Sequence, residues 1–316
     1  MITVLTPLVA SALIAASPAT GGSFHNDWVS ADAQWFAHVD VEGLVGSQLG
    51  QFVLGHAEEL DIDLSDIEGM KEEIGIDPLT DFSGVTVYSA GYSEEDVVII
   101  VQMNSKIDTL VDMLAMKEPT YELIQTGGYG IHSWQDGGET MYGHVAPGRG
   151  EEDRIVTIAH DKTGILRALR VMDDEAPSID DKEKSALRDE PRDGSFFFAT
   201  AFDLNHLLGD EEDPASQVVR RAKSFSLDVG EDDEDAFATA NITARDREHA
   251  RNIVDVLNGI VALGRLFAES ESAAELPLDE VLDALTVTRE RATVIINLEG
   301  DPTVPLKFMM GLHEEM

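Results

Sequence analysis

Two stretches of the chain repeat one pattern, in which a pair of apolar strands flanks a polar turn and a helix follows. Residues 85–90 and 97–103 alternate or run apolar on either side of a turn at 92–96, which predicts a β-hairpin. Residues 225–229 and 236–242 do the same around an acidic turn. Hairpins outnumber the long crossovers that parallel strands need. The expected fold class is therefore α+β, with antiparallel sheets and amphipathic helices packed on them.

The helix after each hairpin begins with the same signal. Residues 105–108 (Ser-Lys-Ile-Asp) and 243–246 (Thr-Ala-Arg-Asp) each place a hydroxyl three residues before a carboxylate, which predicts a capping box. Farther along, residues 110–114 (Leu-Val-Asp-Met-Leu) correspond to 253–257 (Ile-Val-Asp-Val-Leu), and the second helix is expected to continue to about Phe267.

Each copy of the pattern also opens with a strand that ends at an aspartate, Asp40 in the first and Asp203 in the second, placed to cap a helix. These similarities occur in the same order, so we interpret the chain as an internal duplication. The predicted domains are residues 1–23 (signal peptide and flexible lead), 24–190 (first α+β repeat) and 191–316 (second α+β repeat).

Other elements are predicted from periodicity and turn residues. They are a helix with Leu44 to Val53 on its apolar face, a helix at 65–74 ending at Gly75, strands at 121–125, 130–134, 141–145, 155–159 and 196–202, a helix capped by Asp161, a short helix at 278–285, a hairpin at 287–298 and an edge strand at 306–312.

The charge of the chain excludes several partners. It has 61 acidic and 22 basic residues and a formal net charge of -39. Nucleic acids and anionic membrane surfaces repel such a chain unless a basic patch exists, and the densest basic cluster, Arg220, Arg221 and Lys223, has acidic residues on both sides. We therefore predict no nucleic-acid partner. The acidity indicates either solubility or a saline habitat.

The N-terminus carries the localisation signal. Residues 4–16 are largely apolar, and small residues precede a cleavage site after Ala19, which predicts a signal peptide and an exported protein, periplasmic or secreted. No Lys or Arg precedes this run, and the alternative is a disordered or buried tail. No integral membrane segment is predicted elsewhere. The chain contains no cysteine, which excludes disulfides and thiolate chemistry.

One stretch has the oxygen-ligand spacing of a calcium loop. Asp61, Asp63, Ser65 and Glu72 occupy positions 1, 3, 5 and 12 of such a loop. Asp66 stands where the loop needs glycine, and a helix at 65–74 would carry Glu72 away from Asp61. A loop followed by a helix is the favoured interpretation, with weak calcium binding by Asp61, Asp63 and Glu72 as the alternative.

No catalytic signature or cofactor fingerprint is present. The chain lacks a Gly-x-Ser-x-Gly elbow, a P-loop and a zinc-like histidine spacing. The acidic turn at 232–235 is expected to be solvated, and the glycines at 127–128 to form a turn between strands. Three pairs have structural explanations at strand ends or caps: His38 with Asp40, His132 with Trp134, and His160 with Asp161.

The chain resembles a group of uncharacterised exported proteins from planctomycete-type bacteria. The similarity rests on residues 35–40 (Trp-Phe-Ala-His-Val-Asp), 75–81 (Gly-Ile-Asp-Pro-Leu-Thr-Asp), 129–134 (Tyr-Gly-Ile-His-Ser-Trp) and 155–160 (Ile-Val-Thr-Ile-Ala-His). The resemblance implies export and a duplicated α+β fold, and it implies no catalytic residues.

These observations favour an exported, non-enzymatic binding or scaffold protein of the cell envelope or extracellular space, with an envelope protein or polymer as partner. One alternative is a calcium- or salt-dependent structural protein. The other is a hydrolase of an extracellular polymer that uses two carboxylates as acid and base.

Overall fold

The computed structural model describes residues 22–57, 64–181, 187, 190–203, 222–232, 235–268 and 278–302. The signal-like segment before Gly22 and the edge strand expected at 306–312 lie outside them. Contacts divide the chain into a first unit, Met1–Gly46 with Asp63–Glu190, and a second unit, Ser47–Ile62 with Pro191–Met316.

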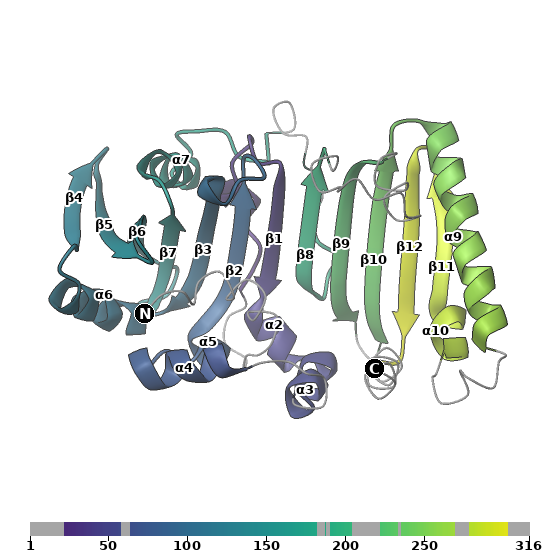
Figure 1. Ribbon diagram of the computed structural model, residues 1–316, viewed down its shortest axis with the longest axis horizontal. Helices are drawn as coiled ribbons and strands as arrows, with labels where there is room; N and C mark the ends of the chain where they lie inside the picture. The colour runs from purple at the N-terminus through teal and green to yellow at the C-terminus, as the bar shows by residue number, and fades with distance from the viewer. Residues whose placement is uncertain are drawn as a thin grey trace. The chain divides into compact units, whose positions relative to one another are not determined.

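The first unit contains an antiparallel sheet in which the last strand of the unit returns beside its third (Figure 1). In spatial order the strands are β1 (Trp35–Asp40), β2 (Phe82–Ser89), β3 (Val97–Asn104), β7 (Asp153–Ala159), β6 (Glu139–Pro147), β5 (Tyr129–Asp136) and β4 (Glu122–Thr126). Every pairing among them is antiparallel.

Helices pack on both faces of this sheet. Side chains alternate along a strand, so neighbours such as Val156 and Thr157 belong to opposite faces. Thr157 donates a hydrogen bond to the Met172 sulfur on the face covered by α7. The helical elements of this unit are η1 (Asn26–Trp28), α2 (Val41–Gly46), α4 (Ser65–Ile74), α5 (Pro78–Asp81), η2 (Glu94–Asp96), α6 (Lys106–Lys117) and α7 (Lys162–Met172).

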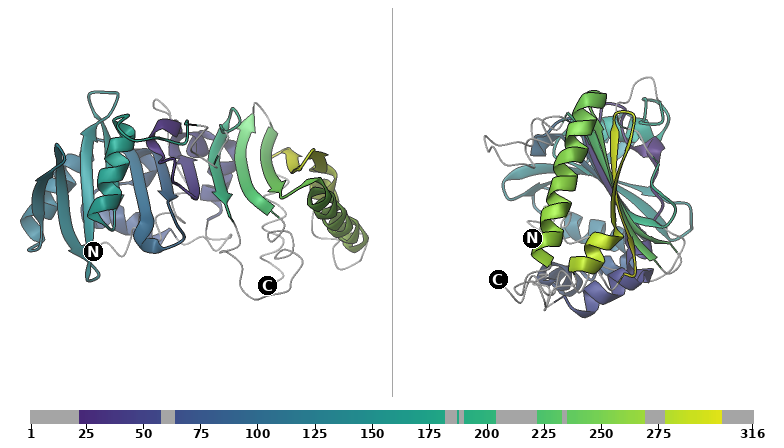
Figure 2. Two further views of the ribbon diagram at one scale, coloured as in Figure 1. Left: turned by 90° about the horizontal axis from the view of Figure 1, so that it is seen from above. Right: turned by 90° about the vertical axis from the view of Figure 1, so that its right-hand side faces the viewer.

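The second unit has a shorter antiparallel sheet. Its spatial order is β8 (Ser195–Phe202), β9 (Ala222–Asp232), β10 (Asp235–Ala244), β12 (Thr293–Gly300) and β11 (Leu285–Glu290). The long helix α9 (Arg247–Ala268) and α10 (Leu278–Ala284) lie on one face of it (Figure 2). Ile253 of α9 packs with Ile242 and Val294 in a buried cluster. The remaining helix, α3 (Gln48–Gly55), has its first amide groups bound by the Glu231 carboxylate of β9.

The antiparallel α+β class is therefore confirmed, and the predicted helix at 65–74 and both hairpins lie where the periodicity placed them. The second long helix was predicted to continue to about Phe267, and α9 ends at Ala268. One helix prediction was wrong in detail. The apolar face from Leu44 to Val53 belongs to two helices, α2 and α3, which separate at Ser47. The Ser47 hydroxyl accepts a hydrogen bond from the Gly50 amide at 2.9 Å, so this residue starts a new helix.

Both predicted capping boxes were also wrong. Ser105 makes no side-chain cap, and the first amide of α6, at Lys106, donates instead to the Asn104 side chain at 3.1 Å. At α9 the cap is Asp246, whose Oδ1 accepts from the Glu248 and His249 amides at 2.9 Å each. Strand β10 runs on through Ala244 into the second predicted box, and β3 ends at Asn104, directly before the first. In both cases the capping residue is not the hydroxyl that opens the box.

None of the helices that the structure describes is long and apolar enough to span a membrane. The α9 helix nevertheless exposes much of its C-terminal half. Ile260, Leu263, Leu266 and Phe267 are each more than half exposed. The part of α9 that packs on the sheet is its N-terminal half, around Ala250 and Ile253.

Candidate functional site

An apolar cavity of about 370 Å³ lies inside the first unit, between helices α4 and α6 and one face of the sheet. A volume in this range is typical of a small-molecule site. Aliphatic, methionine and aromatic residues make most of its wall. The lining includes Met70, Ile74 and Ile76 near α4, Ile107, Leu110, Val111 and Leu114 of α6, and Val101, Met103, Trp134, Val145, Val156 and Ile158 of the strands.

Strand alternation explains why these strand residues meet. Val101 pairs with Val156, and Val156 pairs with Val145, so the three side chains share a face. Helix α6 presents Leu110 and Leu114 to the same space at helical spacing. The sequence pattern predicts these apolar faces but not the space left between them.

Two glycines shape the wall. A Cβ at Gly143 of β6 would lie 3.0 Å from the Trp134 ring, so the absence of a side chain lets the indole lie across this strand. Gly69 of α4 lines the cavity as well, and apart from its chain neighbours and the backbone of its own helix no atom lies within 4 Å of the position of its missing Cβ. An interior glycine weakens a helix, and this one leaves open space where a side chain would stand.

Trp134 also brings an unsatisfied polar group to the wall. Trp134 is only 6% exposed, and its Nε1 has no hydrogen-bond partner in the described structure. A buried N–H without an acceptor costs free energy, and buried indole N–H groups usually find a partner. A ligand acceptor that reached Nε1 would remove that cost.

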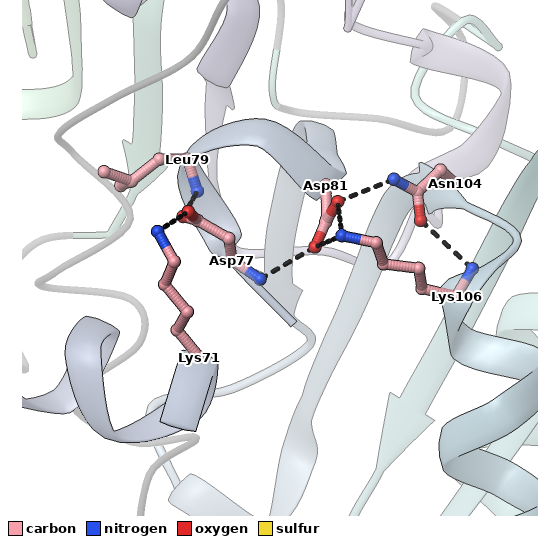
Figure 3. A network of polar contacts seen from close by, with 6 residues as sticks. All are labelled: Lys71, Asp77, Leu79, Asp81, Asn104 and Lys106. Carbon is pink, nitrogen blue, oxygen red and sulfur yellow. Dashed lines mark hydrogen bonds and ion pairs between the residues drawn. The ribbon is translucent and has the colours of Figure 1, made fainter. Parts of the chain in front are cut away.

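A polar network, the Asp81 network, ties together the elements around the cavity (Figure 3). Lys106 at the start of α6 donates to both Asp81 oxygens at 2.7 and 2.8 Å, and Asn104 of β3 donates to Oδ1 at 2.8 Å. The Asp77 amide donates to Asp81 Oδ2, and the Asp77 carboxylate pairs with Lys71 of α4 at 2.7 Å. The network therefore links α4, α5, β3 and α6.

The charge of Asp81 is balanced within this network. Burial alone would raise the pKa of its carboxyl, but the hydrogen bonds from Lys106, the Asp77 amide and Asn104 outweigh burial and lower that pKa. Asp81 is therefore ionised at neutral pH and serves as a structural anchor. A general acid would need the opposite shift.

A second, more open hollow adjoins the cavity and shares Val111, His132 and Val145 with it. We call it the mouth. Its polar side chains are Asp108, Asp112, Glu151, Arg154 and His132. Arg154 forms a bidentate ion pair with Asp108. Its Nε lies 3.1 Å from each carboxylate oxygen, and its Nη2 lies 2.8 Å from Oδ2.

His132 stands where the cavity and the mouth meet. Its Nδ1 lies 2.8 Å from the Tyr121 hydroxyl, and burial lowers its pKa, so the ring is neutral at pH 7. From the sequence, His132 and Trp134 were predicted to have a structural role at the end of a strand. In the structure both line the cavity. Their spacing of two along one strand, which places them on one face, was the signal available in the sequence.

The candidate calcium residues are only partly described. Asp61 and Asp63 lie outside the described residues, whereas Ser65 and Glu72 both belong to α4. Seven residues of helix separate those two by about 10 Å along the axis, too far for both to bind one ion at calcium distances. No group of three or more metal-ligating side chains occurs in the described part of the chain.

The other predicted residues have structural positions. His38 is buried and hydrogen-bonded on both ring nitrogens, and Asp40 accepts from the Gly43 amide as the cap of α2. Asp161 caps α7 as predicted. Gly127 and Gly128 have positive φ in the turn between β4 and β5. In the acidic turn at 232–235, the side chains of 233 and 234 lie outside the described residues.

The arrangement does not favour the carboxylate hydrolase. The cavity has a single carboxylate in its described lining, Glu73, whereas acid–base hydrolysis of glycosides uses a pair. The carboxylates of the mouth, Asp108, Asp112 and Glu151, are exposed, not held in the apolar setting that a general acid needs.

Comparison with known proteins gives no family. No family model matches the chain, and no curated protein does. Among solved structures, crystal form III of TP0453, a Treponema protein, has a TM-score of 0.47 and 9% identity and covers 93% of this chain and 100% of its own. Crystal form I of TP0453 has a TM-score of 0.43 and 10% identity, covering 93% and 98%. TM-scores below 0.5 do not establish a shared fold.

Proposed function

We infer that this protein is an exported, non-enzymatic binding protein whose first unit holds a small apolar ligand between α4, α6 and the sheet. The observation that carries this proposal is the apolar cavity of about 370 Å³, whose lining includes Trp134, a buried residue with an unsatisfied Nε1. Burying an apolar ligand there removes both surfaces from water, at about 25 cal/mol per Å².

The scaffold favours binding over catalysis. The Asp81 network fixes the elements around the cavity, which reduces the ordering that binding has to impose. Most of the wall is aliphatic and aromatic surface, which recognises an apolar ligand without transforming it.

The test uses Gly69, because its missing side chain faces open space beside the cavity. Gly69→Leu is expected to fill that space and lower the affinity for a neutral apolar dye such as Nile red at least tenfold. The same change should stabilise α4 by about 0.5–1 kcal/mol, since leucine is a better helix former than glycine. Dye titration and urea unfolding measure the two effects.

Gly69→Ala is the matched control. It gives α4 the same gain in helix propensity but adds only a methyl group, so it should stabilise the protein and leave dye affinity within about twofold of the wild-type value. Saturable dye binding that persists unchanged in Gly69→Leu would contradict the cavity as the site.

Export rests on the apolar run at 4–16 and the small residues before the cleavage site after Ala19. The exported protein should therefore begin at Thr20. N-terminal sequencing of protein recovered outside the cytoplasm tests this, and an intact Met1 on that protein would overturn it.

We also propose that the two units descend from one duplicated segment. In each unit three strands consecutive in space are antiparallel, a helix follows the third (α6 or α9), and the last strand returns beside the third. These structural parallels support duplication, as the sequence similarities do. An experimental structure of residues 204–221 should show a helix after Asp203, as α2 follows Asp40, and an extended chain there would count against duplication.

A further inference from the structure

The mouth of the cavity has an unbalanced charge. Arg154 is the only cationic side chain among its described lining residues, and Asp108 neutralises it. The Arg154 Nη1 is also committed, since it donates to the carbonyls of Glu151 and Asp153 at 3.1 and 2.9 Å. The guanidinium therefore has little capacity left to receive an anionic group.

Two carboxylates at the mouth remain without an ionic partner in the described structure. Asp112 and Glu151 are exposed, and no ion pair joins either of them to a described Lys or Arg. Glu73 adds another exposed carboxylate to the lining of the cavity itself. Across the whole chain the formal charge of -39 acts in the same direction, so the surroundings repel an anion and attract a cation.

The geometry joins this acidic mouth to an apolar interior. Val111, His132 and Val145 line both hollows, so one molecule can place an apolar body in the cavity and a polar end at the mouth. At the junction the His132 Nδ1 is hydrogen-bonded to Tyr121, whereas its Nε2 has no hydrogen bond to the described residues and is left for the polar end of a ligand.

We propose that the ligand is a cationic amphiphile, with a single apolar body in the cavity and an amine or other cationic group beside Asp112 and Glu151. This inference rests on the proposed function, because it names the chemical class that the same cavity takes. It separates alkylamines from alcohols and fatty acids of equal length, whose apolar parts the cavity would bury equally well.

The experiment measures affinity of the full chain for decylamine, decanol and decanoate by calorimetry at neutral pH, below their aggregation concentrations. The expected order is amine first, alcohol next and carboxylate last. Two exposed carboxylates should favour the amine over the alcohol by about three- to tenfold, and added salt should reduce that preference.

The double variant Asp112→Asn with Glu151→Gln should bring decylamine affinity down to that of decanol and leave decanol unchanged. The control variant is Asp32→Asn with Glu95→Gln. It removes two exposed carboxylates of the same unit that line neither hollow, and it should keep the amine preference.

The outcomes separate the two proposals. Binding of decanol equal to or tighter than decylamine, or an amine preference that the double variant retains, overturns the cationic ligand and leaves the apolar site standing. Failure of all three probes to bind overturns both.

Discussion

His38 lies in the interior of the first unit, where both of its ring nitrogens are hydrogen-bonded. Nδ1 lies 2.9 Å from the Thr86 hydroxyl, and Nε2 lies 2.8 Å from the Gly22 carbonyl oxygen. The carbonyl accepts only, so Nε2 carries the proton and Nδ1 accepts from Thr86. The neutral ring thereby fastens the chain at Gly22 to β1.

We expect His38 to make the stability of the protein depend on pH. Burial lowers its pKa from 6.5 to about 4 in the folded protein. The unfolded chain therefore binds the proton more readily, and stability falls as the pH drops from 6.5 towards 4. The free energy of unfolding falls by about 3 kcal/mol in total once the pH is below both pKa values.

Urea unfolding of wild type and His38→Gln at pH 7 and pH 4.5 measures this effect. Glutamine can keep a donor and an acceptor but does not titrate, so the wild type should lose about 2 kcal/mol more than the variant between these values. His160→Gln, at the partly exposed His160, serves as the control and should follow the wild type. Equal losses in wild type and His38→Gln would exclude His38 as the cause.

Among the elements, α9 depends on a cap that the sequence pattern placed three residues too early. Asp246 binds the Glu248 and His249 amides, so Asp246→Ala should lower the free energy of unfolding by about 1 kcal/mol. Asp246→Asn keeps an acceptor oxygen, so it should lower the free energy of unfolding by only a few tenths of a kcal/mol. Urea titration measures both, and equal losses for alanine and asparagine would show that Asp246 does not act as the cap.

Periodicity predicted elements well because it reflects burial directly. The alternation around 85–103 predicted β2 and β3 to within three residues at each end. Helical spacing predicted that the helix containing Ile253 continues to about Phe267, and α9 ends at Ala268. The break at Ser47 escaped prediction because an apolar face can continue across two helices. The cap predictions failed because neighbouring side chains bind the first helical amides: Asn104 binds the Lys106 amide, and Asp246 binds the Glu248 and His249 amides.

The candidate site was harder to predict than the elements. Its wall joins α4, α6 and five strands, β2, β3 and β5 to β7, and no local sequence pattern indicates which helix covers which strand. His132 and Trp134 share a face by spacing, but their significance depends on Gly143, which lies next to Trp134 only in the folded sheet. Volume left between packed side chains has no local sequence signal.

For the molecule as a whole, the charge of -39 opposes compaction, because the folded chain brings its carboxylates closer together than the unfolded chain does. The structure offsets little of this repulsion. The described ion pairs are mostly exposed, and exposed pairs contribute about 0–1 kcal/mol each. General screening by salt should therefore matter more than any single pair.

We expect the melting temperature to rise with sodium chloride up to about 0.5 M, by about 2–4 °C for each kcal/mol of repulsion that is screened. Calcium chloride at equal ionic strength should give the same rise, because α4 separates Ser65 from Glu72. Thermal unfolding in EDTA, sodium chloride and calcium chloride measures this.

A larger gain in melting temperature with calcium that disappears in the double variant Asp61→Asn with Asp63→Asn would instead assign a calcium site to Asp61 and Asp63. A melting temperature that does not change with salt would mean that repulsion between carboxylates does not limit the stability of this fold.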